Sequence, residues 1–208
     1  MSHGCRVIFF VLCLATFAHA AEPPTTQPTG VITGTVSAPG EVPLSEMVVF
    51  LIPDDNQSIT PPKDVATISQ KDAHFAPSLL IVCVGQSVNF LNDEDRLIEH
   101  NVFSNSPTKQ FDLGLYKPGE GRTVTFDKPG SVNLYCSIHR HMDGVIYVAP
   151  TPYFSRVAAD GSYKIENVPP GHWVVATWQR RRRFQEVRAG AKVSADQPVV
   201  QDLSLKAK

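Results

Sequence analysis

The segment YCSIHRHMDG at residues 135–144 is the most informative part of the chain, because polar and sulfur-containing side chains are concentrated in it. It connects two runs of β-forming residues, so its polar side chains belong to one tight connection between strands. Cys136, His139 and Met142 recur in it at every third position. The segment therefore holds a thiol, an imidazole and a thioether within seven residues.

A second imidazole comes from another predicted strand, in the segment EHNVF at residues 99–103. One thiolate, two imidazoles and a thioether form a soft set of ligands that suits copper cycling between Cu(I) and Cu(II). In copper sites of this kind two imidazoles and a thiolate form a trigonal plane and a thioether is a weak axial ligand. Zinc and iron–sulfur clusters fit less well, because the loop lacks carboxylates and further thiolates.

The pattern C-x2-H-x2-M, preceded by HNV at residues 100–102, resembles the ligand pattern of cupredoxins. The resemblance is strongest to amicyanin and to the plastocyanin-like proteins labelled methylamine utilisation proteins. Three further segments resemble the usual approach to the first histidine in that family: FAP at 75–77, VGQSVNF at 84–90 and ND at 92–93. The resemblance extends over roughly residues 70–149 and implies a Greek-key β-sandwich that holds one type 1 (blue) copper for electron transfer.

The resemblance also implies a role for each site residue. His100, Cys136 and His139 would be the strong copper ligands and Met142 the axial one. Asn101 would hold the strand of the first histidine against the cysteine loop by hydrogen bonds.

The loop departs from the family pattern at two positions. Arg140 and His141 stand between His139 and Met142, where small or apolar residues are more usual. His141 is therefore a rival for the fourth ligand position, although three ligands already fit the short loop without it. Arg140 would place a positive charge beside the metal and is a candidate docking residue for a partner.

The first twenty residues predict export. Arg6 is their only charged residue, a short apolar run follows, and AHA at 18–20 resembles a cleavage site. We expect a secretory signal peptide over 1–20, with an uncleaved anchor as the alternative, and a Pro-rich linker over 21–29. The mature protein is expected to be periplasmic or extracellular, with no further membrane segment.

Two cysteines remain after such a cleavage, and an oxidising compartment would allow a disulfide between them. The metal-type surroundings of Cys136 argue against that pairing. Cys83 lies in the apolar run LLIVCV at 79–84 and is expected to be a buried, inert thiol. His74 precedes a strand run and is expected at the surface.

Short β-type runs separated by Pro-Gly, Asp-Gly and similar turns predict an all-β fold of antiparallel sandwiches or barrels. The runs are 31–36, 47–52, 65–69, 79–84, 87–91, 100–104, 122–126, 131–136, 144–149, 153–157, 162–165, 173–178, 184–188 and 199–205. We expect one sandwich over 62–149 inserted into a second one over 30–61 and 150–208. Two consecutive domains divided near Pro150 are the simpler alternative.

The proposed second sandwich carries a motif of its own. The segment ADGSYKIENVPPGHW at 159–173 resembles the signature of carboxypeptidase regulatory-like (transthyretin-like) sandwiches, and GVITGTV at 30–36 resembles their first strand. That resemblance implies a small β-sandwich used for packing, spacing or docking. Arg180 to Arg183 predict a solvated hairpin tip, or else a docking patch for an acidic partner or anionic surface.

Composition limits the possible functions. A net charge of −1 argues against a protein that mainly binds nucleic acid. No nucleophile elbow, zinc-protease helix or phosphate-binding loop is present, so we do not expect an enzyme. The leading hypothesis is an electron carrier between redox partner proteins that the sequence does not identify. The alternatives are a copper-delivery protein without electron transfer and a structural β-module with a vestigial metal site.

Overall fold

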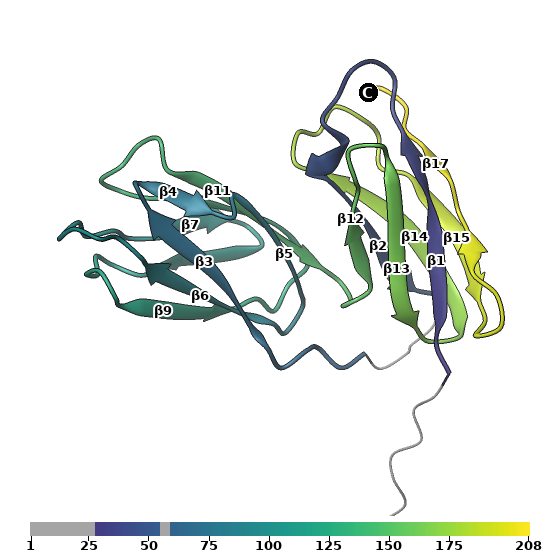
Figure 1. The fold of residues 1–208 in the computed structure, drawn as a ribbon, viewed down its shortest axis with the longest axis horizontal. Helices are drawn as coiled ribbons and strands as arrows, with labels where there is room; N and C mark the ends of the chain where they lie inside the picture. The colour runs from purple at the N-terminus through teal and green to yellow at the C-terminus, as the bar shows by residue number, and fades with distance from the viewer. Residues whose placement is uncertain (1–27, 55–58) are drawn as a thin grey trace, which may run out of the picture.

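The computed structural model describes residues 28–54 and 59–208, and these residues form an all-β protein, as the sequence predicts (Figure 1). A single 3-10 turn, Leu44–Glu46, is the one helical element among them. No helix in the described part of the chain has the length and apolar character needed to span a membrane. The predicted signal peptide at 1–20 and all but the last two residues of the linker at 21–29 lie outside the described residues.

The first sandwich consists of two sheets whose strands all lie between residues 65 and 149. One sheet has the order β5-β11-β10-β7-β8 and the other β4-β3-β6-β9. The strands are β3 Val65–Lys71, β4 His74–Ala76, β5 Leu79–Cys83, β6 Ser87–Asn92, β7 Phe103–Ser106, β8 Lys109–Asp112, β9 Gly121–Thr125, β10 Gly130–Tyr135 and β11 Asp143–Ala149.

The second sandwich takes its strands from both sides of the first in sequence. One sheet has the order β13-β1-β16 with β17 also paired to β1, and the other has the order β12-β2-β14-β15. The strands are β1 Gly30–Ser37, β2 Met47–Pro53, β12 Phe154–Arg156, β13 Ser162–Val168, β14 Gly171–Gln179, β15 Arg188–Val193, β16 Val199–Val200 and β17 Leu203–Ser204. Every ladder among the described strands joins members of the same sandwich.

The strand pattern differs from the expected one in three ways. The sheets are mixed, because β3–β6, β5–β11, β1–β16 and β1–β17 are parallel pairs. The short strands β4 and β8 were not predicted. The strand predicted at 184–188 is wrong: β15 begins at Arg188, and Phe184 is instead a buried core residue in the loop. The Gln179 side chain bonds the N–H groups of Arg183 and Phe184, which keeps this loop out of the ladder.

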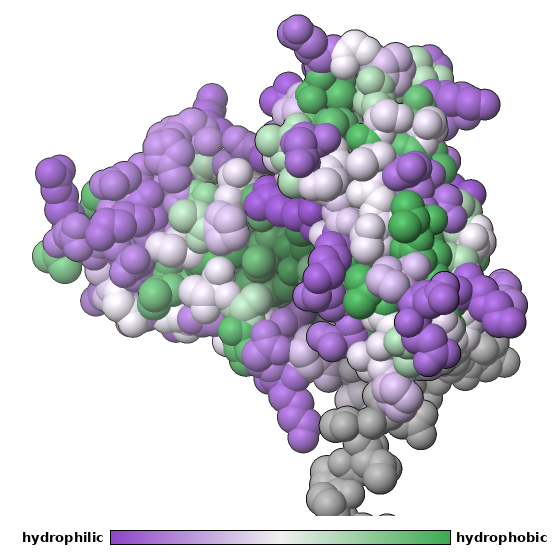
Figure 2. All heavy atoms as spheres, turned by 45° about the vertical axis from the view of Figure 1, so that its right-hand side comes forward, coloured by the Kyte–Doolittle hydropathy of each residue, from purple (hydrophilic) through white to green (hydrophobic). Residues whose placement is uncertain are grey.

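The two sandwiches pack against each other through an apolar cluster that draws on both. Outward-facing residues of β2 and β14 meet outward-facing residues of β11 and β5, and Figure 2 shows hydrophobic side chains where the two lobes meet. The cluster consists of Val48, Phe50, Tyr147, Ala149 and Ala176, with Ile52, Ile81, Phe154 and Trp178 against it. Because alternate residues of a strand face opposite sides, β2 and β11 bury both faces, which explains their nearly continuous apolar sequences.

Specific contacts supplement this apolar interface. The rings of Tyr147 and Trp178 stack with centroids 4.5 Å apart, and the Trp178 Nε1–H donates to Ser131 Oγ at 2.9 Å. Arg180 bonds Asp143 Oδ2 at 3.1 Å and is only one-fifth exposed. Arg180 therefore does not lie in a solvated hairpin tip. It connects the second sandwich to Asp143, the residue that follows Met142.

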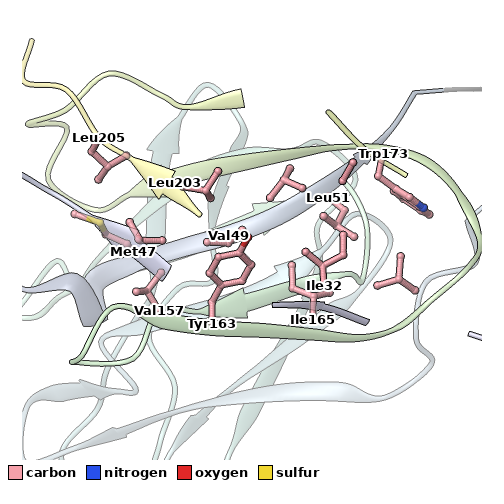
Figure 3. Close-up of a cluster of buried hydrophobic side chains, with 14 of the residues drawn as sticks. Ile32, Met47, Val49, Leu51, Val157, Tyr163, Ile165, Trp173, Leu203 and Leu205 are labelled. Carbon is pink, nitrogen blue, oxygen red and sulfur yellow. The ribbon is translucent and has the colours of Figure 1, made fainter. Parts of the chain in front are cut away.

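Inside the second sandwich, apolar side chains from β1, β2, β13 and β14 interdigitate, with Trp173 at one end (Figure 3). Two glycines of the GVITGTV segment are required by close packing. A Cβ on Gly30 would lie 2.3 Å from Ser194 O, and one on Gly34 would lie 2.1 Å from Gln201 O. Neither distance is compatible with a side chain, so the C-terminal segment packs directly on the backbone of β1.

Candidate metal centre

Three predicted ligands meet at one end of the first sandwich. His100 lies just before β7, and its backbone pairs with Tyr116; Cys136 directly follows β10, and His139 lies in the connection to β11. Their ligand atoms lie within 4.8 Å of one another. The Nδ1 atoms of His100 and His139 are 3.1 Å apart, and Cys136 Sγ is 3.7 Å from His139 Nδ1. His100 thus shares one site with two residues that follow it by 36 and 39 positions in the sequence.

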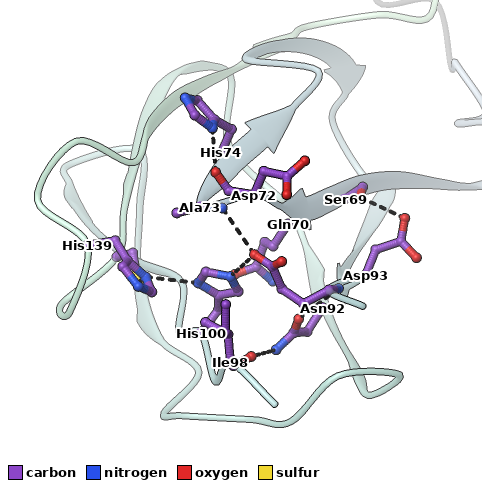
Figure 4. Close-up of polar contacts among 12 residues, drawn as sticks. Ser69, Gln70, Asp72, Ala73, His74, Asn92, Asp93, Ile98, His100 and His139 are labelled. Carbon is purple, nitrogen blue, oxygen red and sulfur yellow. Dashed lines mark hydrogen bonds and ion pairs between the residues drawn. The ribbon is translucent and has the colours of Figure 1, made fainter. Parts of the chain in front are cut away.

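The ring of His100 is fully buried, and a carboxylate contacts its Nε2 atom, the ring nitrogen that does not face His139. Its Nε2 lies 2.8 Å from Glu94 Oε1, and Glu94 is itself almost completely buried (Figure 4). A carboxylate only accepts hydrogen bonds, so Nε2 carries the proton. In the neutral ring Nδ1 then has a free lone pair, directed toward His139. The carboxylate thereby selects the tautomer that can bind a metal through Nδ1.

Glu94 is kept ionised in spite of its burial. Burial opposes the charged form, but hydrogen bonds from His100 and from the backbone N–H groups of Ala73 and Asp72 outweigh it and hold the pKa of Glu94 below its usual value. The same oxygen that binds His100 accepts from Ala73 N–H at 3.0 Å. Glu94 therefore connects the first histidine to the turn between β3 and β4.

Asn101 connects the two ligand-bearing segments. Its Oδ1 accepts the N–H of Ser137 at 2.7 Å, and its Nδ2 donates to Asp112 Oδ1 at 2.9 Å. Because Ser137 directly follows Cys136, this amide holds the cysteine loop against the segment of His100. The loop is closed a second time where Met142 N–H donates to His139 O at 3.0 Å.

The structure separates the two candidates for the fourth ligand by burial. Met142 is 1% exposed and belongs to the same core cluster as Cys136. His141 is exposed, with its ring centroid 6.2 Å from that of His139. Cys83 is fully buried at the opposite end of the sheet, where it pairs with Ala149, and neither cysteine is in a disulfide.

His139 lies at the boundary between this buried site and solvent. Its side chain is half-buried, and its pKa is lowered first by burial and then by the neighbouring His100 and His141. Beside it Ile138 is 51% exposed, and Ile138 lines a surface hollow together with Leu97, which is 95% exposed. Arg140 is also exposed. The hollow is also lined by Lys117 and Glu99, so apolar side chains and charges of both signs lie near this end of the site.

The donor set fits a copper ion. Three groups that bind soft or borderline metals direct their donor atoms at one another, and a cation there would satisfy the thiolate and both imidazole lone pairs. Glu94 and Asn101 would form the outer shell that orients such ligands. Among the described residues, His100, Cys136 and His139 are the only group of three or more His, Cys, Asp or Glu side chains whose ligand atoms lie close enough together to hold one metal ion.

Sequence reasoning missed Glu94. It stands in the acidic run NDED at 92–95, which by pattern alone is typical of a solvated loop. The Asn92 side chain folds this run inward, because its Nδ2 donates to Ile98 O at 2.9 Å and to Tyr116 O at 3.0 Å. An acidic residue shortly before a predicted metal-binding histidine is a usable signal, since such histidines commonly donate to carboxylates.

No protein-family model and no curated protein matches the chain. Among solved structures, the chain is similar to a purple cupredoxin from Nitrosopumilus maritimus, with 24% identity and a TM-score of 0.36 over 40% of this chain and 99% of that one. Amicyanin from Paracoccus versutus has 15% identity and a TM-score of 0.37, over 47% of this chain and 96% of that one. A copper-containing nitrite reductase from Thermus scotoductus SA-01 has 22% identity and a TM-score of 0.38, over 54% of this chain and 28% of that one.

Proposed function

We propose that this chain is an exported type 1 copper protein that carries single electrons between redox partners and is not an enzyme. The observation that supports it most is the convergence of a cysteine thiol and two histidine Nδ1 atoms at a largely buried point. Copper bound there would supply a one-electron couple between Cu(I) and Cu(II). The sequence of residues 1–20 supports export.

The residues around the proposed site have separate tasks. His100, Cys136 and His139 would hold the ion, and the buried thioether of Met142 would be available as a further, weak ligand. Glu94 holds the proton on His100 Nε2, and Asn101 fixes the cysteine loop. Ligands held by these hydrogen bonds should keep their geometry when a bound copper ion gains or loses one electron. A small change in geometry favours fast electron transfer.

We further propose that a partner docks at the exposed end of the site, over His139. Leu97 and Ile138 offer apolar contact there. Arg140 and Lys117 add two positive charges against the single carboxylate of Glu99, which lines the same hollow. An acidic partner would then be attracted over distances that salt reduces, with a screening length of about 8 Å at physiological ionic strength. Arg140→Glu should slow electron exchange with an acidic redox protein and reverse its salt dependence.

The second sandwich is proposed to be a carboxypeptidase regulatory-like module without chemistry of its own. Its contacts with the first sandwich support a packing role, because Trp178 and Arg180 reach Ser131 and Asp143 on the strands that flank the cysteine loop.

Copper reconstitution of the apo-protein tests the proposed function. One equivalent of Cu(II) should produce an intense visible charge-transfer absorption, and voltammetry should show reversible one-electron cycling at a positive potential. Tight binding of one copper without reversible cycling would favour copper delivery instead. No copper binding at all would contradict both functions and leave a structural module.

A further inference from the structure

Four of the five histidines in the described residues form a continuous row from the surface to the buried site. Ring centroids are 5.7 Å apart between His74 and His141, 6.2 Å between His141 and His139, and 4.7 Å between His139 and His100. The outer two side chains are exposed, His139 is half-buried and His100 is fully buried. The proposed copper site uses only the inner two.

His74 is prepared to bind a metal. Its Nδ1 lies 2.6 Å from Asp72 O, and a carbonyl oxygen can only accept, so Nδ1 carries the proton and the neutral ring has its lone pair on Nε2. Figure 4 shows its ring turned away from His100. A backbone carbonyl that holds one ring nitrogen while the other binds an ion is the usual second contact of a metal-binding histidine.

The turn that carries His74 is tied to the buried carboxylate of Glu94. Asp72 and Ala73 have φ values of 51° and 55°, a region that side chains with a Cβ seldom adopt. The Ala73 N–H bonds the same Glu94 oxygen that binds His100, so one buried carboxylate positions both the outermost and the innermost histidine. Positive φ at both residues is what the two-residue hairpin turn between β3 and β4 requires, and this turn places His74 at the first position of β4.

The separation of the outer pair suits a shared ion. Histidine nitrogens bind Cu(II) or Zn(II) at about 2 Å, and rings with centroids 5.7 Å apart can both direct a nitrogen at one ion between them. Two imidazoles with water in the remaining positions form a weak and exchangeable site. Arg140, the exposed residue before His141, would further weaken the hold on a cation through its positive charge.

We propose that His74 and His141 form a second, surface metal site that captures a copper ion and passes it through His139 to the buried ligands. The loading role rests on the proposed copper function, but binding at the surface pair does not. His141 then acts as a transfer ligand in front of His139 rather than as a permanent fourth ligand.

A zinc titration tests the surface site by itself. Zn(II) added to the protein, with Cu(I) supplied beforehand to fill the buried ligands if they bind it, should shift the imidazole NMR signals of His74 and His141 and leave those of His172, an exposed histidine of the second sandwich, unchanged. His74→Asn and His141→Asn should each weaken this binding by at least about tenfold, since loss of even an outer contact costs that much. His172→Asn is the matched control. Unshifted His74 and His141 signals would overturn the site, whether or not the buried residues bind copper.

Loading kinetics test the transfer role. When apo-protein is mixed with Cu(II) in a stopped-flow instrument, the double variant His74→Asn/His141→Asn should develop the visible absorption several-fold more slowly than wild type and reach the same final spectrum. An equal rate would overturn the loading role. A wild type that never develops the absorption would contradict the proposed function, and the zinc titration would still decide whether the surface pair binds metal.

Discussion

The two sandwiches differ in how they use buried polar side chains. In the first, three buried polar side chains near one end bond other side chains: Gln70 bonds the Tyr116 hydroxyl, and His100 and Asn101 bond the carboxylates of Glu94 and Asp112. In the second, the buried polar side chains bond only backbone groups: Thr177 and Gln179 accept N–H groups of the loop after β14, and Thr151 donates to Leu51 O.

This difference separates a site from a scaffold. Buried polar groups that bond each other fix particular rotamers and tautomers, at a cost in desolvation. Buried polar groups that bond the backbone only complete the hydrogen bonding of the fold. Substitutions in the first set should therefore change the chemistry of the site, whereas those in the second sandwich should change only stability.

The largest expected effect comes from the cysteines. Cys136→Ala should abolish the visible copper absorption, because only a thiolate gives the strong charge-transfer band. Cys83→Ala is the matched control, since that thiol is equally buried but lies at the other end of the sheet. Absorption spectra of both reconstituted variants are the measurement, and a coloured Cys136→Ala protein would refute the site.

A core substitution in the second sandwich should leave the site intact. Leu51→Ala removes a fully buried side chain and should destabilise that sandwich by about 2–5 kcal/mol. Denaturant unfolding followed by tryptophan fluorescence measures the loss, because Trp173 packs in the same core. The visible absorption in native buffer should stay unchanged. If it disappears while the second sandwich is still folded, the two regions are more tightly coupled than their contacts indicate.

Glu94 should control metal affinity without touching the metal. Glu94→Ala leaves the buried Nε2–H of His100 without its acceptor, and copper affinity should fall by about 10–100-fold. Glu94→Gln keeps an acceptor oxygen and should recover most of that loss. Competition with a chelator of known affinity measures both. Equal affinities for wild type and Glu94→Ala would show that His100 is positioned by packing alone.

Met142 should tune the site rather than hold it. The axial thioether bond is weak, so Met142→Leu should keep the visible colour and raise the reduction potential. His141→Ala should leave the potential nearly unchanged, because its ring is exposed whereas Met142 is buried. Voltammetry on the two variants distinguishes them. A large shift for His141→Ala with none for Met142→Leu would make His141 the fourth ligand.

The smallest effect is expected at the contact between the sandwiches. Arg180→Ala breaks the ion pair with Asp143, whose side chain is largely exposed, and should cost about 0–1 kcal/mol. The stack of Tyr147 on Trp178 remains in this variant. Its unfolding free energy and its reduction potential should both be close to those of wild type. A clear shift in potential would show that the second sandwich acts on the cysteine loop through Arg180.

The sequence alone determined the β-rich fold and the residue types of the site. Alternating apolar residues between turn signals are a local pattern, which strands such as Ser87–Asn92 and Gly130–Tyr135 follow, and the continuous apolar run of Met47–Pro53 is equally local. The spacing of Cys136, His139 and Met142 is equally local, because one short loop carries all three. Such features depend on neighbours along the chain and can be found without a tertiary structure.

Only the tertiary structure decided which distant groups meet. Glu94 reaches His100 because Asn92 folds an acidic loop inward, and Arg180 reaches Asp143 because the outer faces of β2 and β14 pack on β11. The start of β15 at Arg188 and the meeting of His74 with His141 likewise depend on packing between remote segments. Contacts of this kind leave no period or spacing in the sequence, since each is fixed by the relative placement of whole strands rather than by adjacent residues.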